Sequence, residues 1–334
     1  MQHAVHLEGA RRLSVTVVPV REPRGDEVRV RVAYAGICGS DLHVFETGAY
    51  VPRFPVTPGH EVSGCVEAVG PEVRDLALNT PVVLDSRVPC GVCDGCMAGE
   101  PQRCRAIGFL GEVCDGGFAH SVVVPRRAVY PLPPDLPLPV AALAEPCAVA
   151  LHAVRRAHQV APHATTALIV GLGPLGALTG LVLRRQGLSV AGVETDACRR
   201  GTVARATGLP IYDAPDLPRE PYDLVVDTAG FTGSWVACLE RARAGGTVLA
   251  LALHRQVEAL DANLVVEREL TLLGAHVFRD EMGEALALLA EESATFSRLI
   301  TAVVPPDSVP EAFATLLAGG SGQIKVLVAP GDEA

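Results

Sequence analysis

The chain lacks long apolar runs: nowhere in its 334 residues does an uncharged apolar stretch approach the roughly 18 residues of a membrane-spanning helix. It also lacks an N-terminal basic segment followed by an apolar core, so we expect no secretory signal peptide and a cytoplasmic protein without a membrane partner. Lysine is nearly absent: Lys325 is the only one, and the other side chains counted with it as positively charged are arginines. The scarcity of lysine by itself points to no function.

An excess of positive charge is missing too, since the formal net charge is −10 at pH 7. An acidic chain is a poor general partner for nucleic acid or an anionic membrane, which leaves small soluble molecules as the expected partners. The content of 49% hydrophobic and 20% charged residues is typical of a globular protein. A chain of this length is expected to form two domains, and it contains no internal repeat or low-complexity tract.

What the chain does contain is a cluster of cysteines in a C-x2-C-x2-C-x7-C pattern: Cys90, Cys93, Cys96 and Cys104. In a reducing compartment, clustered cysteines indicate metal ligands before disulfides. Four thiolates can close a tetrahedral structural zinc site. A bacterial iron–sulfur motif also begins C-x2-C-x2-C but has a shorter last gap and a proline after it, whereas Arg105 follows here. The spacing therefore predicts structural zinc, with an iron–sulfur cluster and then a disulfide as weaker alternatives.

Glycine and proline interrupt the first part of the chain, which carries short β-type runs such as 28–32 and 121–124. This pattern predicts a mostly β domain with long functional loops. A proline-rich stretch at 131–139 precedes an Ala/Leu/Val-rich segment that can be helical through about His158. We expect the two domains to be joined there.

From Thr166 onward, apolar strands alternate with helical stretches, which is typical of βαβ units in a doubly wound, parallel α/β sheet. The expected elements cover residues 167–171, 173–186, 189–194, 198–207, 224–228, 234–243 and 247–252. A last apolar strand at 324–328 can rejoin either domain.

A glycine motif follows the first of these strands: Gly171, Gly173 and Gly176, with Pro174 and Leu175 between the last two. A lone GxGxxG is a weak signal, but a strand before it and a helix after it are the context of a dinucleotide-binding site. The glycines allow a tight turn and a close backbone approach to a pyrophosphate, whose charge the helix N-terminus favours. The alternative is that the glycines serve a turn and nothing more.

Glu194 ends the second strand, about 20 residues after the glycines, where a carboxylate can accept hydrogen bonds from the ribose hydroxyls of the adenosine. A 2′-phosphate would meet like charge there, so the sequence favours NAD over NADP. Arg199 and Arg200 lie close by in the sequence and can turn toward a phosphate, which would favour NADP instead.

Two segments nearer the start complete the pattern: Gly36-Ile-Cys38-Gly-Ser40-Asp-Leu-His43 and Pro58-Gly-His60-Glu61. With the cysteine cluster and the glycine motif, in this order and spacing, they resemble the zinc-dependent medium-chain alcohol dehydrogenases, in particular the polyol branch. The resemblance implies a GroES-like, mostly β catalytic domain over residues 1–146 and 297–334, with a zinc lobe at about 88–105. It also implies a Rossmann coenzyme domain over residues 147–296, and a homodimer or homotetramer.

The resemblance further implies two zinc ions per chain, the structural one described above and a catalytic one bound by Cys38 and His60. Glu61 is implied as an exchangeable ligand or a neighbour of the ligands, and Glu145 as the third ligand. One thiolate, one carboxylate and a neutral imidazole neutralise Zn²⁺ and leave its fourth position open for water or alcohol. The helix dipole alone also favours a carboxylate near a helix N-terminus, so the role of Glu145 stays open.

The implied reaction is hydride transfer between a secondary alcohol or polyol, or the matching ketone, and NAD(H), assisted by zinc. Ser40 is implied as a relay hydroxyl and His43 as the outer base, a task for which histidine is suited. The other hypotheses are a zinc-free quinone or enoyl reductase of the same fold and a non-catalytic nucleotide-binding protein. The pattern does not select among vicinal diols, sugar alcohols, cyclitols and amino alcohols.

One departure from the family is visible before the cysteine cluster, where relatives carry a Gly-Asp-basic turn and this chain has Asn79, Thr80 and Pro81. Asparagine tolerates the positive φ that a glycine would take in such a turn. Asn79 can therefore take the conformation of that glycine, and the departure bears on the detail of the loop rather than on the chemistry.

Overall fold

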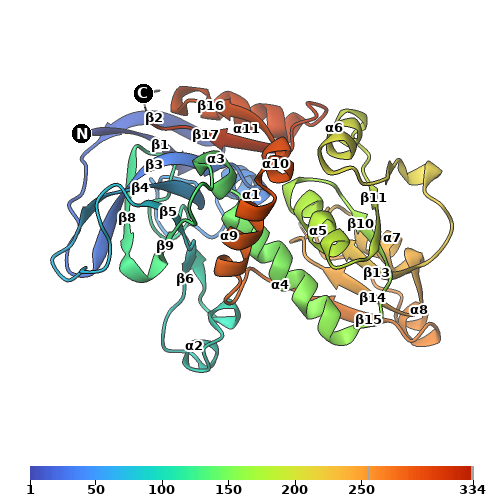
Figure 1. Ribbon diagram of the computed structural model, residues 1–334. Helices are drawn as coiled ribbons and strands as arrows, with labels where there is room; N and C mark the ends of the chain where they lie inside the picture. The colour runs from blue at the N-terminus through green and yellow to red at the C-terminus, as the bar shows by residue number, and fades with distance from the viewer. Residues whose placement is uncertain (255, 332–334) are drawn as a thin grey trace. The chain divides into compact units, whose positions relative to one another are not determined.

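The computed structural model describes residues 1–254 and 256–331, and these form two compact units (Figure 1). The first unit comprises Met1–Glu145, Met282–Ala318 and the chain from Lys325 onward. The second comprises Pro146–Glu281 and Gly319–Ile324. The first change from one unit to the other falls inside helix α4 (Ala144–Val160), as expected from the Ala/Leu/Val-rich segment.

The first unit is mostly β. Its largest sheet has the strand order β16-β17-β3-β4-β5-β9, with β8 also paired to β3, and all pairs are antiparallel except β16 with β17. These strands are β16 (Ile300–Val304), β17 (Lys325–Val328), β3 (Glu27–Gly36), β4 (Glu61–Val69), β5 (Pro81–Leu84), β9 (Val129–Pro131) and β8 (Ser121–Pro125). Two smaller sheets pair β1 (Gln2–Gly9) with β2 (Arg12–Val18), and β6 (Arg87–Val88) with β7 (Gly108–Phe109).

Alternation of valine with polar residues explains the central strand of this sheet. Val28, Val30 and Val32 of β3 are buried, whereas Arg29 and Arg31 between them face the other way. The valines pack with apolar residues of β4, β5, β8 and α11 in one core. The helices of this unit are α1 (Gly39–Thr47), α2 (Asp94–Met97), α3 (Leu138–Ala141), α9 (Met282–Glu291), α10 (Ser293–Phe296) and α11 (Val309–Ala318).

The second unit is built on a six-stranded parallel sheet in the order β12-β11-β10-β13-β14-β15. Its strands are β10 (Thr166–Val170), β11 (Ser189–Val193), β12 (Ile211–Tyr212), β13 (Tyr222–Asp227), β14 (Ala242–Ala250) and β15 (Thr271–Gly274). Its helices are α5 (Pro174–Arg185), α6 (Ala197–Thr207), α7 (Ser234–Arg241) and α8 (Ala262–Glu267). The strand order reverses between β10 and β13, which is the doubly wound arrangement that binds dinucleotides at the reversal point. The predicted α/β fold class is confirmed.

The elements predicted from the alternating pattern are all present as β10, α5, β11, α6, β13, α7 and β14, with their ends shifted by a few residues. The pattern missed β12 and β15, because strands of two and four residues are too short to show a period. The strands expected at 28–32 and 121–124 lie within β3 and β8. Asn79 has a φ of 63°, the positive-φ conformation that asparagine tolerates in such a turn.

The bounds of the two units differ from those of the expected domains, in which residues 147–296 formed the coenzyme domain. Helices α9 and α10 belong to the first unit, where α9 packs against α3. Gly319–Ile324 belongs to the second, because the N–H of Gly320 donates to the carboxylate of Asp196 at 2.9 Å. The apolar strand whose partner the sequence left open is β17, and it lies between β16 and β3 in the first unit.

Candidate metal and nucleotide sites

Antiparallel pairing of β3 with β4 brings the first metal motif together. Gly36 at the end of β3 lies opposite Glu61 at the start of β4. Cys38 is the residue before α1, and His60 is the residue before β4. The sulfur of Cys38, a ring nitrogen of His60 and a carboxylate oxygen of Glu61 lie within 4.8 Å of one another. Two strand ends thus gather a thiol, an imidazole and a carboxylate, a donor set that suits zinc.

A glycine makes this approach possible. Gly59 has a φ of 97°, and a Cβ at that position would lie 2.5 Å from the ring of Phe118. A side chain is therefore excluded both by conformation and by space. The close packing of Phe118 on Gly59 fixes the backbone that presents His60.

Asp41 lies beside both of the first two donors. Its carboxylate accepts the N–H of Cys38 at 2.8 Å, and the other oxygen lies 3.3 Å from Nδ1 of His60. That nitrogen is buried and makes no hydrogen bond within the described residues. Burial opposes the charged imidazolium, but Asp41 and Cys38 outweigh it and hold the pKa of His60 well above its ordinary value. A buried ring nitrogen next to a thiol and two carboxylates fits a cation at this point.

The only lysine of the chain is buried against Glu61. The Nζ of Lys325 lies 2.7 and 2.6 Å from the two carboxylate oxygens of Glu61 and donates to the carbonyl of Ile37 at 3.0 Å. The two side chains are 1% and 0% exposed. Burial lowers the pKa of Lys325, but the charges of Glu61, Cys38 and Asp41 outweigh it and raise that pKa above its ordinary value. Lys325 therefore competes with any metal ion for the oxygens of Glu61.

Glu145 lies in the first turn of α4 and is buried, with Oε1 accepting the hydroxyl of Ser86 at 3.1 Å. Burial raises the pKa of Glu145 to about 7, with His60 opposing the shift and Glu61 adding to it. Among the residues that the structure describes, Glu145 is not part of the group whose ligand atoms lie within 4.8 Å of one another. The carboxyl of Glu145 is thus close enough to His60 and Glu61 for their charges to act on it, but it is not one of the three grouped ligands Cys38, His60 and Glu61.

Ser40 and His43 lie on α1, two and five residues beyond Cys38. Both side chains are half-buried. The ring of His43 lies 6.1 Å from that of Tyr50, which is 60% exposed. Helix α1 thus carries a hydroxyl and an imidazole in the same short segment that begins at the thiol.

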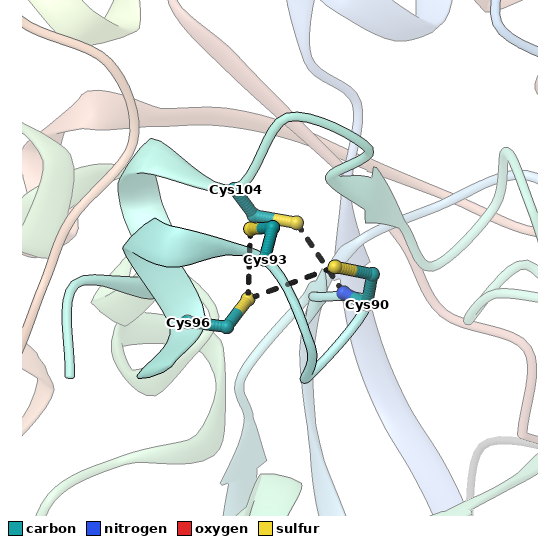
Figure 2. A group of neighbouring side chains, drawn as sticks. All are labelled: Cys90, Cys93, Cys96 and Cys104. Carbon is teal, nitrogen blue, oxygen red and sulfur yellow. Dashed lines mark hydrogen bonds between the residues drawn. The ribbon is translucent and has the colours of Figure 1, made fainter. Parts of the chain in front are cut away.

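The four clustered cysteines lie between β6 and β7, with the short helix α2 among them. Their sulfurs point toward one another and all lie within 4.8 Å (Figure 2). The sulfurs of Cys93 and Cys96 are 3.6 Å apart, and the N–H of Cys90 donates to the sulfur of Cys104 at 3.3 Å. Backbone N–H groups lower the pKa of Cys93 to about 6, which favours the thiolate that a metal needs. None of the four is in a disulfide. The lobe fits a closed tetrahedral zinc site.

The glycine motif opens α5 at the end of β10. Gly171 has a φ of 88°, and a Cβ there would lie 2.7 Å from Ala229. A Cβ on Gly176 would lie 2.1 Å from the carbonyl oxygen of Gly171. Gly173 precedes the helix and Pro174 is its first residue, where the missing N–H does no harm. The turn leaves the helix N-terminus open to an anion.

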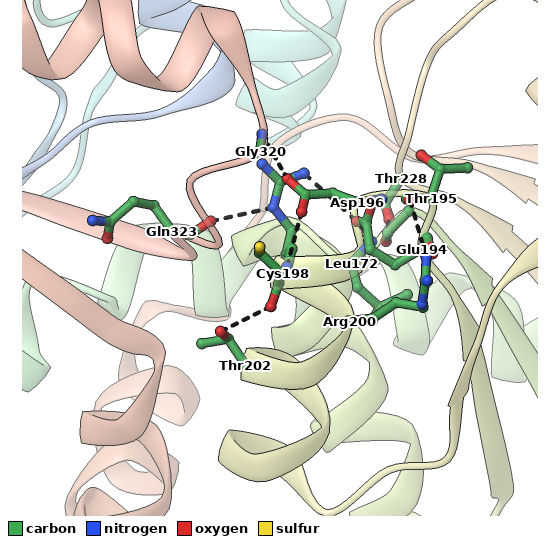
Figure 3. Close-up of polar contacts among 12 residues, drawn as sticks. Leu172, Glu194, Thr195, Asp196, Cys198, Arg200, Thr202, Thr228, Gly320 and Gln323 are labelled. Atoms are coloured by element: carbon green, nitrogen blue, oxygen red, sulfur yellow. Dashed lines mark hydrogen bonds and ion pairs between the residues drawn. The ribbon is translucent and has the colours of Figure 1, made fainter.

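Glu194 lies at the end of β11 and holds this turn. Its carboxylate, 6% exposed, accepts the N–H of Leu172 at 3.0 Å and the N–H of Asp196 at 2.9 Å (Figure 3). Arg199 lies 3.6 Å from the same carboxylate, and Arg200 donates to the carbonyl of Glu194 at 2.8 Å. Both arginines flanking the site are therefore directed at Glu194 itself.

Comparison with known proteins agrees with these sites. Residues 24–134 match the alcohol dehydrogenase GroES-like domain. The chain is 31% identical over 323 residues to L-idonate 5-dehydrogenase of Vitis vinifera, covering 90% of this chain and 87% of that one. It is 31% identical over 319 residues to 2-dehydro-3-deoxy-L-galactonate 5-dehydrogenase of Pseudoalteromonas atlantica, covering 92% of each. It also resembles the solved structure of a protein described as a zinc-binding dehydrogenase of Sinorhizobium meliloti 1021, bound to NADP, with a TM-score of 0.89, 31% identity and 99% of each chain covered.

A GroES-like unit and a doubly wound dinucleotide unit together define a medium-chain dehydrogenase. The chain belongs to the zinc-dependent alcohol and polyol dehydrogenase family of that class. It is an NAD(P)-dependent oxidoreductase of secondary alcohols, so the predicted family and enzyme class are confirmed. No helix in residues 1–254 and 256–331 is both long and apolar enough to span a membrane.

Three residues that surround the candidate metal site escaped the sequence analysis: Asp41, Ser86 and Lys325. Asp41 stands three residues after Cys38, at a position that commonly caps a helix start, and that spacing was a usable signal. A single charged residue within the apolar run 324–328, at the start of β17, was the signal for Lys325. Nothing in the sequence near Ser86 marks it.

Proposed function

We propose that this enzyme oxidises a secondary hydroxyl group of a polyol, or reduces the matching ketone, with a catalytic zinc ion and NAD. The observation that carries the proposal is the grouping of Cys38, His60 and Glu61 within 4.8 Å. A zinc-free reductase of the same fold has no use for such a group.

Cys38, His60 and Glu145 are the proposed protein ligands of the catalytic zinc. One thiolate and one carboxylate balance the charge of the ion, and the neutral imidazole completes the set. Glu61 stays a neighbour in this proposal, because both of its oxygens are engaged by Lys325 at 2.6 and 2.7 Å. When bound, zinc acts as a Lewis acid that makes a hydroxyl group easier to deprotonate.

Ser40 and His43 are proposed to carry the substrate proton away. Ser40 lies two residues beyond Cys38 on α1, and His43 lies one helical turn further toward the exposed Tyr50. A hydroxyl can accept and pass on a proton without keeping it, and an imidazole can release it to water. The two residues thus form a route from the half-buried thiol at the start of α1 outward.

The second proposed zinc ion is structural and held by Cys90, Cys93, Cys96 and Cys104. Four thiolates leave no open coordination position, so this ion has no part in turnover. Its role is to close the segment between β6 and β7.

NAD rather than NADP is the proposed coenzyme, bound at Gly171, Gly173, Pro174, Leu175, Gly176, Glu194 and Arg199. The buried carboxylate of Glu194 would repel a 2′-phosphate. Arg200 is occupied by the carbonyls of Glu194 and Thr195 at 2.8 and 3.0 Å, so it is not free to receive one. NADP should be tested as well, because the solved structure from Sinorhizobium meliloti 1021 is bound to NADP.

The proposed substrates are small polyhydroxylated molecules, because the relatives act on L-idonate and on a deoxy-galactonate, as their names state. The proposed assembly is a homodimer or homotetramer formed through β15, which ends the order of the six-stranded sheet. Leu272 of this strand is 37% exposed, as an interface residue would be in the free chain.

The test is reduction of NAD and of NADP by a panel of polyols, secondary alcohols and amino alcohols, before and after removal of metal with a chelator. We expect turnover with polyols, a higher kcat/KM with NAD, and loss of turnover on chelation that zinc restores. Undiminished activity in material that contains no zinc would contradict the proposed function. A higher kcat/KM with NADP would overturn only the choice of coenzyme.

A further inference from the structure

The turn that follows β7 carries one acidic side chain at its tip. The carbonyl oxygen of Phe109 accepts the N–H groups of Glu112 and Val113, both at 3.1 Å. The N–H of Gly111 donates to the carbonyl of Cys114 at 2.8 Å. Glu112 is therefore held in a tight, internally bonded turn, and its side chain is half-buried.

This turn is anchored on the segment that ends in His60. The N–H of Gly117 donates to the carbonyl of Gly59 at 2.7 Å. On the other side of the turn, Gly111 comes so close that a Cβ on it would lie 2.7 Å from the backbone nitrogen of Gly59. Glu112 follows directly after this contact, so the turn fixes it beside the backbone that presents the imidazole.

The carboxyl of Glu112 is close enough to His60 and Asp41 for their charges to act on it. Burial raises the pKa of Glu112 to about 7, the nearby His60 opposes this shift, and Asp41 adds to it. Within residues 1–254 and 256–331, the carboxyl makes no hydrogen bond and no ion pair. Its oxygens are not among the buried side-chain atoms that lack a hydrogen bond, so water reaches them in the free protein, and a molecule that displaced this water would have to supply a donor in its place.

The charges around this carboxyl favour such a donor. Asp41, Glu61 and Glu145 are the acidic neighbours of the site, and Lys325 is already paired with Glu61. Among the residues that the structure describes, His60 is the basic group whose charge acts on Glu112, and Lys325 is held by Glu61. A hydroxyl or an ammonium group of the substrate supplies the missing hydrogen-bond donor.

We propose that Glu112 is a substrate-binding residue that selects molecules carrying a hydrogen-bond donor, a hydroxyl or an ammonium group, beside the hydroxyl that is oxidised. This proposal rests on the proposed function and narrows its substrate class to alcohols that carry such a donor beside the oxidised hydroxyl. It predicts that simple secondary alcohols are poor substrates because they leave Glu112 unsatisfied.

The test uses three alcohols with one carbon skeleton: 2-butanol, 2,3-butanediol and 3-amino-2-butanol. The enzymes are the wild type, Glu112→Gln, Glu112→Leu and, as a matched control on an exposed loop of the same unit, Glu72→Gln. Steady-state kcat and KM are measured for each pair, with zinc content and thermal midpoint recorded for every variant. Glu112→Gln keeps the size of the side chain, so it carries the test if Glu112→Leu does not fold.

In Glu112→Leu, the preference for the diol or the amino alcohol over 2-butanol should fall about tenfold or more, mainly through KM. The kcat/KM for 2-butanol should stay within about twofold of the wild type, and Glu72→Gln should match the wild type throughout. A larger loss for the amino alcohol in Glu112→Gln identifies an ammonium as the preferred group, and a larger loss for the diol identifies a hydroxyl.

Equal changes for all three alcohols, or no change, would overturn the role of Glu112 while leaving the proposed function intact, since the wild type still oxidises alcohols. No turnover by the wild type on any of the three, with NAD or with NADP, would overturn the proposed function and this inference together.

Discussion

Lys325 offers the sharpest test at the scale of a single residue. Replacement by methionine keeps the length of the side chain but leaves the carboxylate of Glu61 buried and unpaired. Breaking a buried ion pair in this way costs about 3–5 kcal/mol, so Lys325→Met should lower the free energy of unfolding by that order. Urea unfolding followed by fluorescence measures it. The exposed Arg74→Met is the control and should change little.

The double variant Lys325→Met with Glu61→Gln separates charge from packing. If the unpaired carboxylate is the cause, neutralising it recovers part of the lost stability. If the double variant is as unstable as Lys325→Met alone, the loss comes from packing, and the importance assigned to the ion pair is wrong.

His43 is the second test at this scale. His43→Gln removes the proposed outer base but keeps a polar side chain on α1. Activity near neutral pH should fall by about 10²-fold or less and recover as the hydroxide concentration rises, since hydroxide replaces the base. The measurement is kcat against pH for the variant and the wild type. A pH profile identical to that of the wild type would remove His43 from the proton route.

The residues that could be predicted from the sequence are those whose motif is local. Cys38 and the four cysteines stand in short patterns whose chemistry depends on spacing along the chain. Lys325 and Glu112 have no such pattern, because their neighbours come from distant parts of the sequence. Lys325 meets Glu61 only because β17 and β4 flank β3 in one sheet, and that strand order cannot be inferred from the order of residues.

At the scale of the element, the cysteine lobe should behave as a separate stabilising part. Its two short strands and four-residue helix are too small to fold without a cross-link. Cys96→Ser should therefore lower the thermal midpoint and solubility, and reduce the zinc content from two ions per chain toward one. Turnover per folded chain should change little, because the lobe has no open coordination position.

The control for the lobe is Cys114→Ser, an exposed cysteine outside the cluster. It should keep the zinc content and the thermal midpoint of the wild type. Elemental analysis and thermal unfolding on the same preparations check both variants. A Cys96→Ser protein with a full complement of zinc would contradict the assignment of the four cysteines as ligands.

At the scale of the whole molecule, periodicity predicts the elements of the second unit but does not show to which unit each segment belongs. Buried strands such as β10 and apolar helices such as α5 each carry a local signal. The assignment of α9 to the first unit and of Gly319–Ile324 to the second depends on what they pack against and bond to. Contacts of this kind are tertiary, so no window of sequence contains them.

The pH dependence of stability should depend strongly on Glu281, the last residue before the chain leaves the second unit for α9. Its carboxylate is 1% exposed and lies 2.9 Å from Nδ1 of His152 and 3.0 Å from Arg155. The N–H groups of Arg279 and Asp280 donate to it at 2.6 and 3.0 Å. Burial opposes ionisation, but these donors outweigh it and lower the pKa of Glu281 from 4.5 to about 2.

A pKa that is lower in the folded state stabilises that state at any pH above the ordinary value of 4.5, and the gain disappears as the pH falls toward 2. Glu281→Gln should therefore lower the free energy of unfolding by about 3 kcal/mol at neutral pH. The difference between variant and wild type should shrink below pH 4.5 and vanish near pH 2. Acid also protonates the zinc thiolates, but it does so in both proteins, so the difference between them isolates Glu281. Denaturant unfolding at a series of pH values measures this difference in the free energy of unfolding. The exposed Glu267→Gln is the control. A difference that stays constant across this pH range would show that Glu281 contributes by packing rather than by charge.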